Sequence, residues 1–197
     1  MITLFHHPRT RSTRFIFLLE ELGAPYEIKT ITLRGRTQGA ADPANPHPHG
    51  KAPALKDGGT VVFESAAIAL YLTDRFPQAG LGPVVGDALR GAYVSWLAYY
   101  AGEFEPAFIT KFMNVEAPRP MAGWANAEDV MAFVTATLEK GPYLLGEKFS
   151  ALDILFGTTF QMFMKSPLLP ATPLLESYVA RVTGRPAYAR ALEHDKV

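Results

Sequence analysis

The fold of this chain is decided by two short segments, GKAPAL at residues 50–55 and ESAAI at residues 64–68. Between them, Gly58-Gly59 supplies the positive φ angles that a two-residue hairpin turn needs. The β-branched run Thr60–Phe63 follows this turn and is typical of a strand. The order predicts a short strand over 54–56, a glycine turn, a second strand, and a helix that opens at Glu64-Ser65.

The start of this helix is a place where a small anion can bind. The N–H groups of a helix's first turn have no partner within the helix, and together with the helix dipole they attract a carboxylate. A hydroxyl such as that of Ser65 also suits a helix cap. Pro53 cannot donate to a β-ladder, so it suits a strand start or a cis turn.

The rest of the amino-terminal half alternates strands with helices. Residues 2–6 form a buried strand pattern, and a helix with an apolar face runs from Ser12-Thr13 to Gly23. A second strand is predicted over 26–33, and residues 34–49 form a loop with at most one short helix. The helix that begins at Ser65 ends at Arg75. This β-α-β, β-β-α order is that of a thioredoxin-like domain, and residues 76–83 form a linker.

The carboxy-terminal half is predicted to be entirely helical. One long helix covers 88–109 and carries several aromatic residues. Further helices are predicted over 127–140, 151–164, 173–181 and 186–192, the third of them apolar on all sides and therefore central. Ser150 and Asp153 at its start are close to a capping box.

Three segments resemble the glutathione transferase family. They are HHPRTRSTR with LLEELG at residues 6–14 and 18–23, the opening pair of segments with Tyr71-Leu72, and FSALDI at residues 149–154. They lie in the family's order and cover most of the chain. The resemblance implies an α/β amino-terminal thioredoxin-like domain at residues 1–78, which binds glutathione. It also implies an all-α carboxy-terminal domain at residues 84–197, which contributes the site for an electrophile.

Composition agrees with a compact cytoplasmic enzyme. Of the 197 residues 48% are apolar, and the formal net charge is zero, which argues against nucleic acid or an anionic membrane as partner. No apolar run approaches the ~20 residues of a membrane span, and no export leader precedes the first strand. The chain has no cysteine, which fits a reducing compartment and means that the protein supplies no thiol of its own.

If glutathione is the co-substrate, its thiol must be ionised to act as a nucleophile. A free thiol has a pKa of roughly 8.5, and a hydroxyl donor, a helix start and a cation each favour its anion. The turn after the first strand offers all three. A gapless match to serine-type family members places Thr10 at the position that contacts the sulfur, with Ser12 as the alternative and a helix cap as its other role. Arg11 is either a stabilising cation or a solvated side chain.

The resemblance also implies the rest of the glutathione site. Glu64 would bind the γ-glutamyl ammonium and Ser65 its carboxylate. Ala52 would pair its backbone with the cysteinyl backbone, as an added strand does, and a cis Pro53 would aim those groups. Lys51 is expected to pair with the glycine carboxylate.

The expected activity is transfer of the glutathione thiolate to a small hydrophobic electrophile, by a homodimer. A glutathione-dependent isomerase, dehalogenase or peroxidase, and a binding module without turnover, are the alternatives. An electrophile site is expected against the long helix, between the two halves, with core packing as the other role of its candidates Tyr99, Tyr100, Glu103, Phe104 and Phe108. No metal is expected, because the five histidines lack metal-site spacing.

Overall fold

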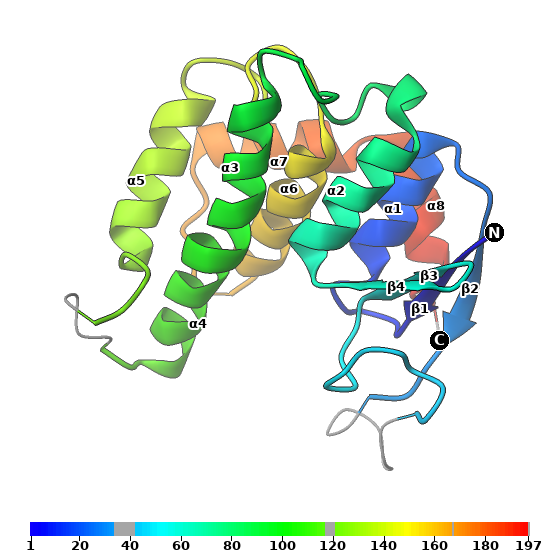
Figure 1. Cartoon of the computed structure of the whole chain (residues 1–197). Helices are drawn as coiled ribbons and strands as arrows, with labels where there is room; N and C mark the ends of the chain where they lie inside the picture. Colours follow the sequence, from blue (N-terminus) through cyan, green and yellow to red (C-terminus); the bar gives the residue numbers. More distant parts are fainter. Residues whose placement is uncertain (34–41, 117–120, 167, 197) are drawn as a thin grey trace. The chain divides into compact units, whose positions relative to one another are not determined.

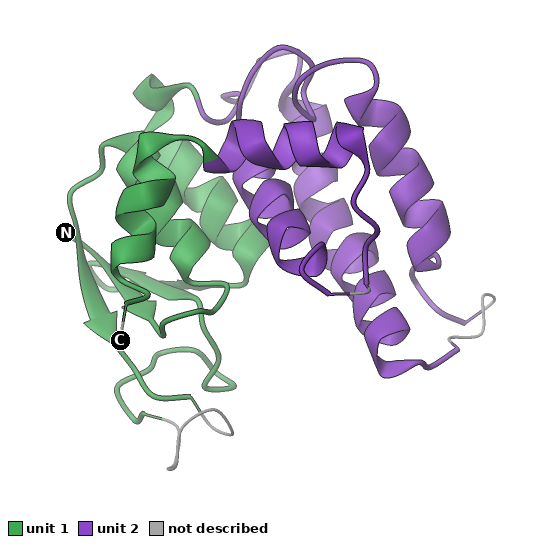
Figure 2. Ribbon diagram, turned by 180° about the vertical axis from the view of Figure 1, so that it is seen from behind, with its two compact units in different colours: residues 1–80, 184–197 green, residues 81–183 purple. Residues whose placement is uncertain are grey.

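The computed structural model describes residues 1–197 except 34–41, 117–120, 167 and 197. The chain forms two compact units, one made of residues 1–80 and 184–197 and the other of residues 81–183 (Figure 2). This division differs from the expected one at the carboxy-terminal end. Residues 184–197 were assigned to the helical half, yet they pack within the first unit.

The first unit is built on a four-stranded mixed sheet in the order β2-β1-β3-β4. Strand β1 (Ile2–His6) pairs in parallel with β2 (Tyr26–Thr30) and antiparallel with β3 (Ala54–Asp57), which forms the predicted hairpin with β4 (Thr60–Phe63). The thioredoxin-like order is therefore confirmed. Strand β2 ends at Thr30 rather than at residue 33, because its partner β1 ends opposite it at His6.

Helices α1 (Thr13–Leu22) and α2 (Ser65–Arg75) cover one face of this sheet (Figure 1), and the short 3-10 helix η1 (Pro77–Ala79) follows α2. Helix α8 (Pro186–Glu193) lies beside α1. The rings of Phe17 and Tyr188 are 5.3 Å apart, and Arg185 binds Glu21 with two hydrogen bonds of 2.8 and 2.7 Å. These contacts explain why the segment after residue 183 belongs to the first unit.

The second unit consists of helices α3 (Arg90–Tyr99), α4 (Glu105–Met113), α5 (Ala127–Leu138), α6 (Ala151–Phe163) and α7 (Pro173–Thr183). The long helix predicted over 88–109 is interrupted by a π-helical turn, η2 (Tyr100–Phe104). Pro106 follows at the start of α4 and has no N–H to donate to the preceding turn. One widened turn lets the chain continue as a helix past this proline.

Helix α6 is buried along most of its length, as its apolar composition predicts. Its predicted capping box is confirmed, because Ser150 and Asp153 satisfy each other's backbone N–H groups. Asp153 also accepts hydrogen bonds from the Leu144 N–H at 3.0 Å and the Tyr178 hydroxyl at 2.9 Å. One buried carboxylate thus joins the start of α6 to the segment before it and to α7. In the described part of the chain, no helix has the length and apolarity to cross a membrane.

Candidate functional site

The register of the sheet brings three sequence-predicted segments to one end of it. Phe5 of β1 lies opposite Ala54 of β3, and Ala54 lies opposite Phe63 of β4. Three segments therefore lie at the same end of the sheet: the turn that follows β1, the Ala52-Pro53 peptide that precedes β3, and the Glu64-Ser65 pair that follows β4. Hydrogen bonding of antiparallel neighbours sets this arrangement.

The turn after β1 holds two hydroxyl groups that differ in exposure. Thr10 is half-buried, and its hydroxyl donates to the His7 carbonyl at 2.7 Å. Ser12 is 0% exposed, and its Oγ lies 2.7 Å from Thr10 Oγ1 and 2.9 Å from His6 Nδ1. It also accepts from the His7 N–H at 3.2 Å. Thr10 thus carries the more accessible hydroxyl, and the buried Ser12 hydroxyl lies in hydrogen-bond contact with it.

The expected capping role of Ser12 is wrong. Ser12 occupies the N-cap position of α1, but its backbone is helical and its side chain makes no capping hydrogen bond. Its hydroxyl is instead committed to His6 and His7. A cap needs an extended backbone that turns the side chain back to the helix amides. Arg11 is half-buried in the same turn.

The Ala52-Pro53 peptide bond is cis, which confirms the prediction. Pro53 is buried, and Ala52 packs on the cluster of Phe5, Ile31 and Ala54. Lys51 is exposed, and its carbonyl accepts from the Asn45 side chain at 2.9 Å. The backbone that would pair with a peptide ligand is therefore anchored on both sides.

Glu64 and Ser65 begin α2, but their capping arrangement differs from the expected one. Glu64 is the N-cap residue and its side chain makes no capping hydrogen bond, while Ser65 is the first helical residue. Glu64 has φ 69°, a left-handed backbone that a residue other than glycine adopts at a cost of about 1–3 kcal/mol. Its carboxylate is 64% exposed, so the pair is open to a ligand.

His47 lies behind this pair and was considered in the sequence only as a metal ligand. Its Nε2 lies 3.7 Å from Glu64 Oε1, and its ring packs edge-on against Phe63 at 5.5 Å. Burial lowers the pKa of His47 although Glu64 opposes this shift. Its Nδ1 accepts from the His49 N–H at 3.1 Å, so the neutral ring presents its N–H to Glu64. A histidine between two prolines carries no sequence signal for this role.

Three of the five electrophile-site candidates are core residues of the second unit. Tyr100, Phe104 and Phe108 are buried, and the Tyr100 hydroxyl binds Glu105 at 2.8 Å. Glu103 accepts from the Ala125 N–H at 2.7 Å and is half-buried. Burial raises the pKa of Tyr99, with Glu103 adding to this shift. Among the described residues, no three histidine or acidic side chains gather as metal ligands would.

Comparison with known proteins identifies the first unit. Residues 1–74 match the family model of the glutathione S-transferase amino-terminal domain. Glutathione S-transferase GstA of Escherichia coli O157:H7 is 27% identical over 194 residues, covering 96% of this chain and 96% of its own. Glutathione S-transferase F6 of Arabidopsis thaliana is 24% identical, covering 97% of this chain and 99% of its own.

Solved structures extend the likeness to the whole chain. A glutathione transferase from Methylococcus capsulatus str. Bath superposes with a TM-score of 0.81 at 28% identity, covering 99% of this chain and 98% of its own. A sphingomonad glutathione S-transferase complexed with glutathione has a TM-score of 0.81 at 28% identity, covering 99% of each chain. Residues 1–74 are thus matched by the glutathione S-transferase amino-terminal domain, and over nearly its whole length the chain is similar in sequence and fold to glutathione S-transferases.

Proposed function

We propose that this protein transfers the thiolate of glutathione to small hydrophobic electrophiles. The observation that carries the proposal is that the Thr10 turn, the cis Ala52-Pro53 peptide and the Glu64-Ser65 pair lie together at one end of the sheet. Glu64 would bind the ammonium of the γ-glutamyl group and Ser65 its carboxylate. Ala52 would pair with the cysteinyl backbone, and Lys51 with the glycine carboxylate.

Thr10 is the proposed donor to the sulfur, which requires its hydroxyl to turn from the His7 carbonyl toward the ligand, and Arg11 is a nearby cation. A hydrogen bond to the thiolate favours the ionised form and lowers its pKa. The chain has no cysteine, so no mixed disulfide with a protein thiol enters the mechanism. The nucleophile is the thiolate of glutathione. It attacks the electrophilic carbon, and the leaving group departs with the bonding electrons.

Turnover with a panel of electrophiles tests this function. A chlorinated nitroaromatic, an epoxide, a peroxide and an isomerisable acid are each incubated with the protein and glutathione. Transfer consumes one glutathione for each conjugate formed, whereas an isomerase returns glutathione and a peroxidase oxidises it. Glutathione binding without any turnover would instead identify a binding module.

We expect Ser65→Ala to weaken glutathione binding by roughly tenfold, because a ligand carboxylate that loses its hydroxyl partner loses ~1–3 kcal/mol. Isothermal titration with glutathione measures this change. Ser95→Ala, an exposed serine in α3, is the matched control and leaves binding unchanged. Equal affinity of the Ser65→Ala variant and the wild type would show that Ser65 does not contact the ligand.

We also propose a cytoplasmic homodimer, which the absence of cysteine and an exposed sheet edge support. Strand β4 lies at the edge of the sheet and exposes Val61 and Phe63 by 39% and 41%. Closed twofold dimers are the commonest soluble oligomers, and pairing of two copies would cover this surface. One chain has a mass of 21.6 kDa, and light scattering at micromolar concentration should give twice this mass. The mass of a single chain would contradict the proposal.

A further inference from the structure

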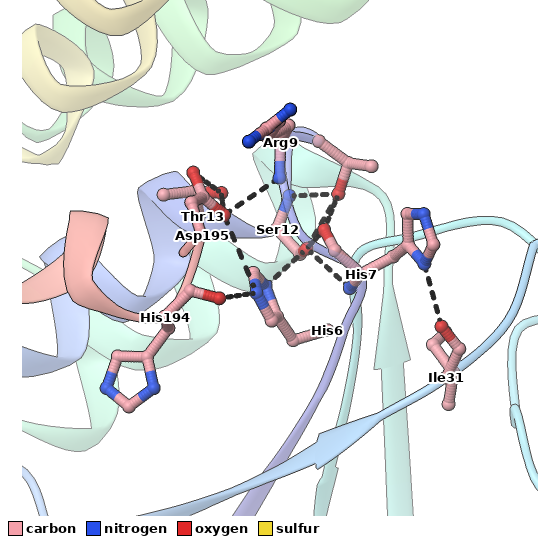
Figure 3. A network of polar contacts seen from close by, with 9 residues as sticks. His6, His7, Arg9, Ser12, Thr13, Ile31, His194 and Asp195 are labelled. Carbon is pink, nitrogen blue, oxygen red and sulfur yellow. Dashed lines mark hydrogen bonds and ion pairs between the residues drawn. The ribbon is translucent and has the colours of Figure 1, made fainter. Parts of the chain in front are cut away.

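The segment directly after α8 folds onto the turn that carries Thr10. Asp195 Oδ1 accepts from the Arg9 N–H at 2.8 Å (Figure 3). The Thr13 hydroxyl lies 2.8 Å from Oδ1 and 3.0 Å from Oδ2 of the same carboxylate. Asp195 therefore binds the chain on both sides of Thr10, once in the turn and once at the first residue of α1.

The contact to Arg9 holds a strained backbone. Arg9 has φ 57°, in the left-handed region that residues other than glycine avoid. Such a conformation persists only where its surroundings determine it, and a hydrogen bond to a charged acceptor is among the stronger ways to do so. Without the Asp195 carboxylate, the Arg9 N–H loses this acceptor and the turn is free to relax.

His6 connects the same segment to the floor of the turn. Its ring is buried, 1% exposed, at the end of β1. Nε2 lies 3.3 Å from the His194 carbonyl oxygen and 3.6 Å from Asp195 Oδ1, while the His194 ring points away (Figure 3). Both of these groups are acceptors, so Nε2 carries the proton. Burial lowers the pKa of His6, which favours the neutral ring.

The tautomer of His6 decides how the two hydroxyls are used. With Nε2 protonated, Nδ1 is an acceptor and Ser12 donates to it across 2.9 Å. The single hydroxyl proton of Ser12 is then spent inside the protein. Ser12 Oγ in turn accepts from the His7 N–H, and Thr10 Oγ1 lies within hydrogen-bond distance of Ser12 Oγ, at 2.7 Å. Thr10 is the half-exposed hydroxyl of the pair, and donation to a sulfur requires its O–H to turn away from the His7 carbonyl, to which it donates at 2.7 Å.

From these contacts we infer that Asp195 is a positioning residue for thiol activation, because it locks the turn in the conformation that presents the Thr10 hydroxyl. The segment after α8 is then part of the glutathione site without touching the ligand. This inference rests on the proposed function of Thr10. It assigns a role to a residue far from the amino-terminal motifs in sequence.

The test compares three variants. In Asp195→Ala the apparent pKa of the bound glutathione thiol should rise by about one unit, so that kcat/KM below that pKa falls about tenfold. Glutathione affinity should change by less than about twofold, because the contacts of Glu64 and Ser65 remain. Asp195→Asn keeps an acceptor oxygen for Arg9 and Thr13 and should restore most of the activity. Glu193→Ala is the control and should match the wild type, because the Glu193 carboxylate lies at the surface, where it binds Lys196.

The readouts are the pH profile of kcat/KM, the ultraviolet absorbance of the bound thiolate, and the hydrogen exchange of the Arg9 amide without glutathione. Faster exchange of that amide in Asp195→Ala supports the lock. An unchanged thiol pKa in that variant would overturn the inference, as would an Asp195→Asn variant equally impaired. Affinity, turnover and unfolding midpoint falling together would show a merely structural role and also overturn it.

The same experiment separates this inference from the proposed function. A wild-type protein that binds no glutathione, or leaves its thiol un-ionised, would refute the proposed function. The exchange of the Arg9 amide still reports whether Asp195 holds the turn in that case. Thr13→Val provides a fourth variant, because it removes one donor to the carboxylate of Asp195 and should slow turnover by a smaller factor than Asp195→Ala does.

Discussion

We expect Asp153→Ala to lower the free energy of unfolding by about 4 kcal/mol, an exceptional loss for one substitution. The change leaves the Leu144 N–H, the Ser150 N–H and the Tyr178 hydroxyl without their acceptor inside the core. Each unsatisfied buried donor costs about 1–3 kcal/mol. Urea unfolding followed by fluorescence measures the effect.

Glu128→Ala is the matched control for this change, because Glu128 also lies in the first turn of a helix but pairs with Lys111 at the surface. It should cost at most about 1 kcal/mol. An Asp153→Ala variant as stable as this control would show that the buried network contributes little.

The same residue gives the protein a pH dependence of defined sign. Burial raises the pKa of Asp153 from 3.8 to about 6, against the effect of its hydrogen bonds. The folded state thus holds this proton more tightly than the unfolded state does. The resulting stabilisation is complete below about pH 4 and is lost as the pH rises through about 6. Relative to Asp153→Asn, the wild type should lose up to about 3 kcal/mol across this range.

Thr10→Ala should reduce transfer at neutral pH by about ten- to a hundredfold. A hydrogen bond to a charged group contributes about 1.5–3 kcal/mol, and each 1.4 kcal/mol is a factor of ten. Glutathione affinity should fall little, because the proposed contacts of Glu64 and Ser65 remain. Thr10→Ser keeps the donor with less bulk and should retain or improve the rate. Steady-state kinetics together with the absorbance of the bound thiolate measure these effects.

Ser12→Ala should behave differently. Its buried hydroxyl serves His6 and His7, so its loss should chiefly reduce stability, by about 1–3 kcal/mol. The converse result, with Ser12→Ala abolishing thiolate formation and Thr10→Ala silent, would transfer the proposed role to Ser12. If neither variant changes thiolate formation, ionisation must depend on backbone N–H groups and Arg11.

The elements that depend on neighbours in sequence were predicted well. The glycine hairpin, the helix after Glu64 and the capping box at Ser150 and Asp153 are local patterns, and all are present. Features that depend on a distant partner were not. Strand β2 ends early because β1 ends, and the segment 184–197 joins the first unit because α8 packs on α1.

The candidate site divides in the same way. The sequence by itself determined the segments of the proposed glutathione site, because their turn residues, helix start and spacing are encoded within a few residues of one another. Only the folded turn shows which hydroxyl is accessible, because Ser12 is buried with its Oγ against His6 at the end of β1 whereas Thr10 is half-exposed. Tertiary structure also brought Asp195 to Arg9, a contact between residues 186 positions apart. No periodicity or motif links such residues, because only the packing of α8 against α1 makes them neighbours.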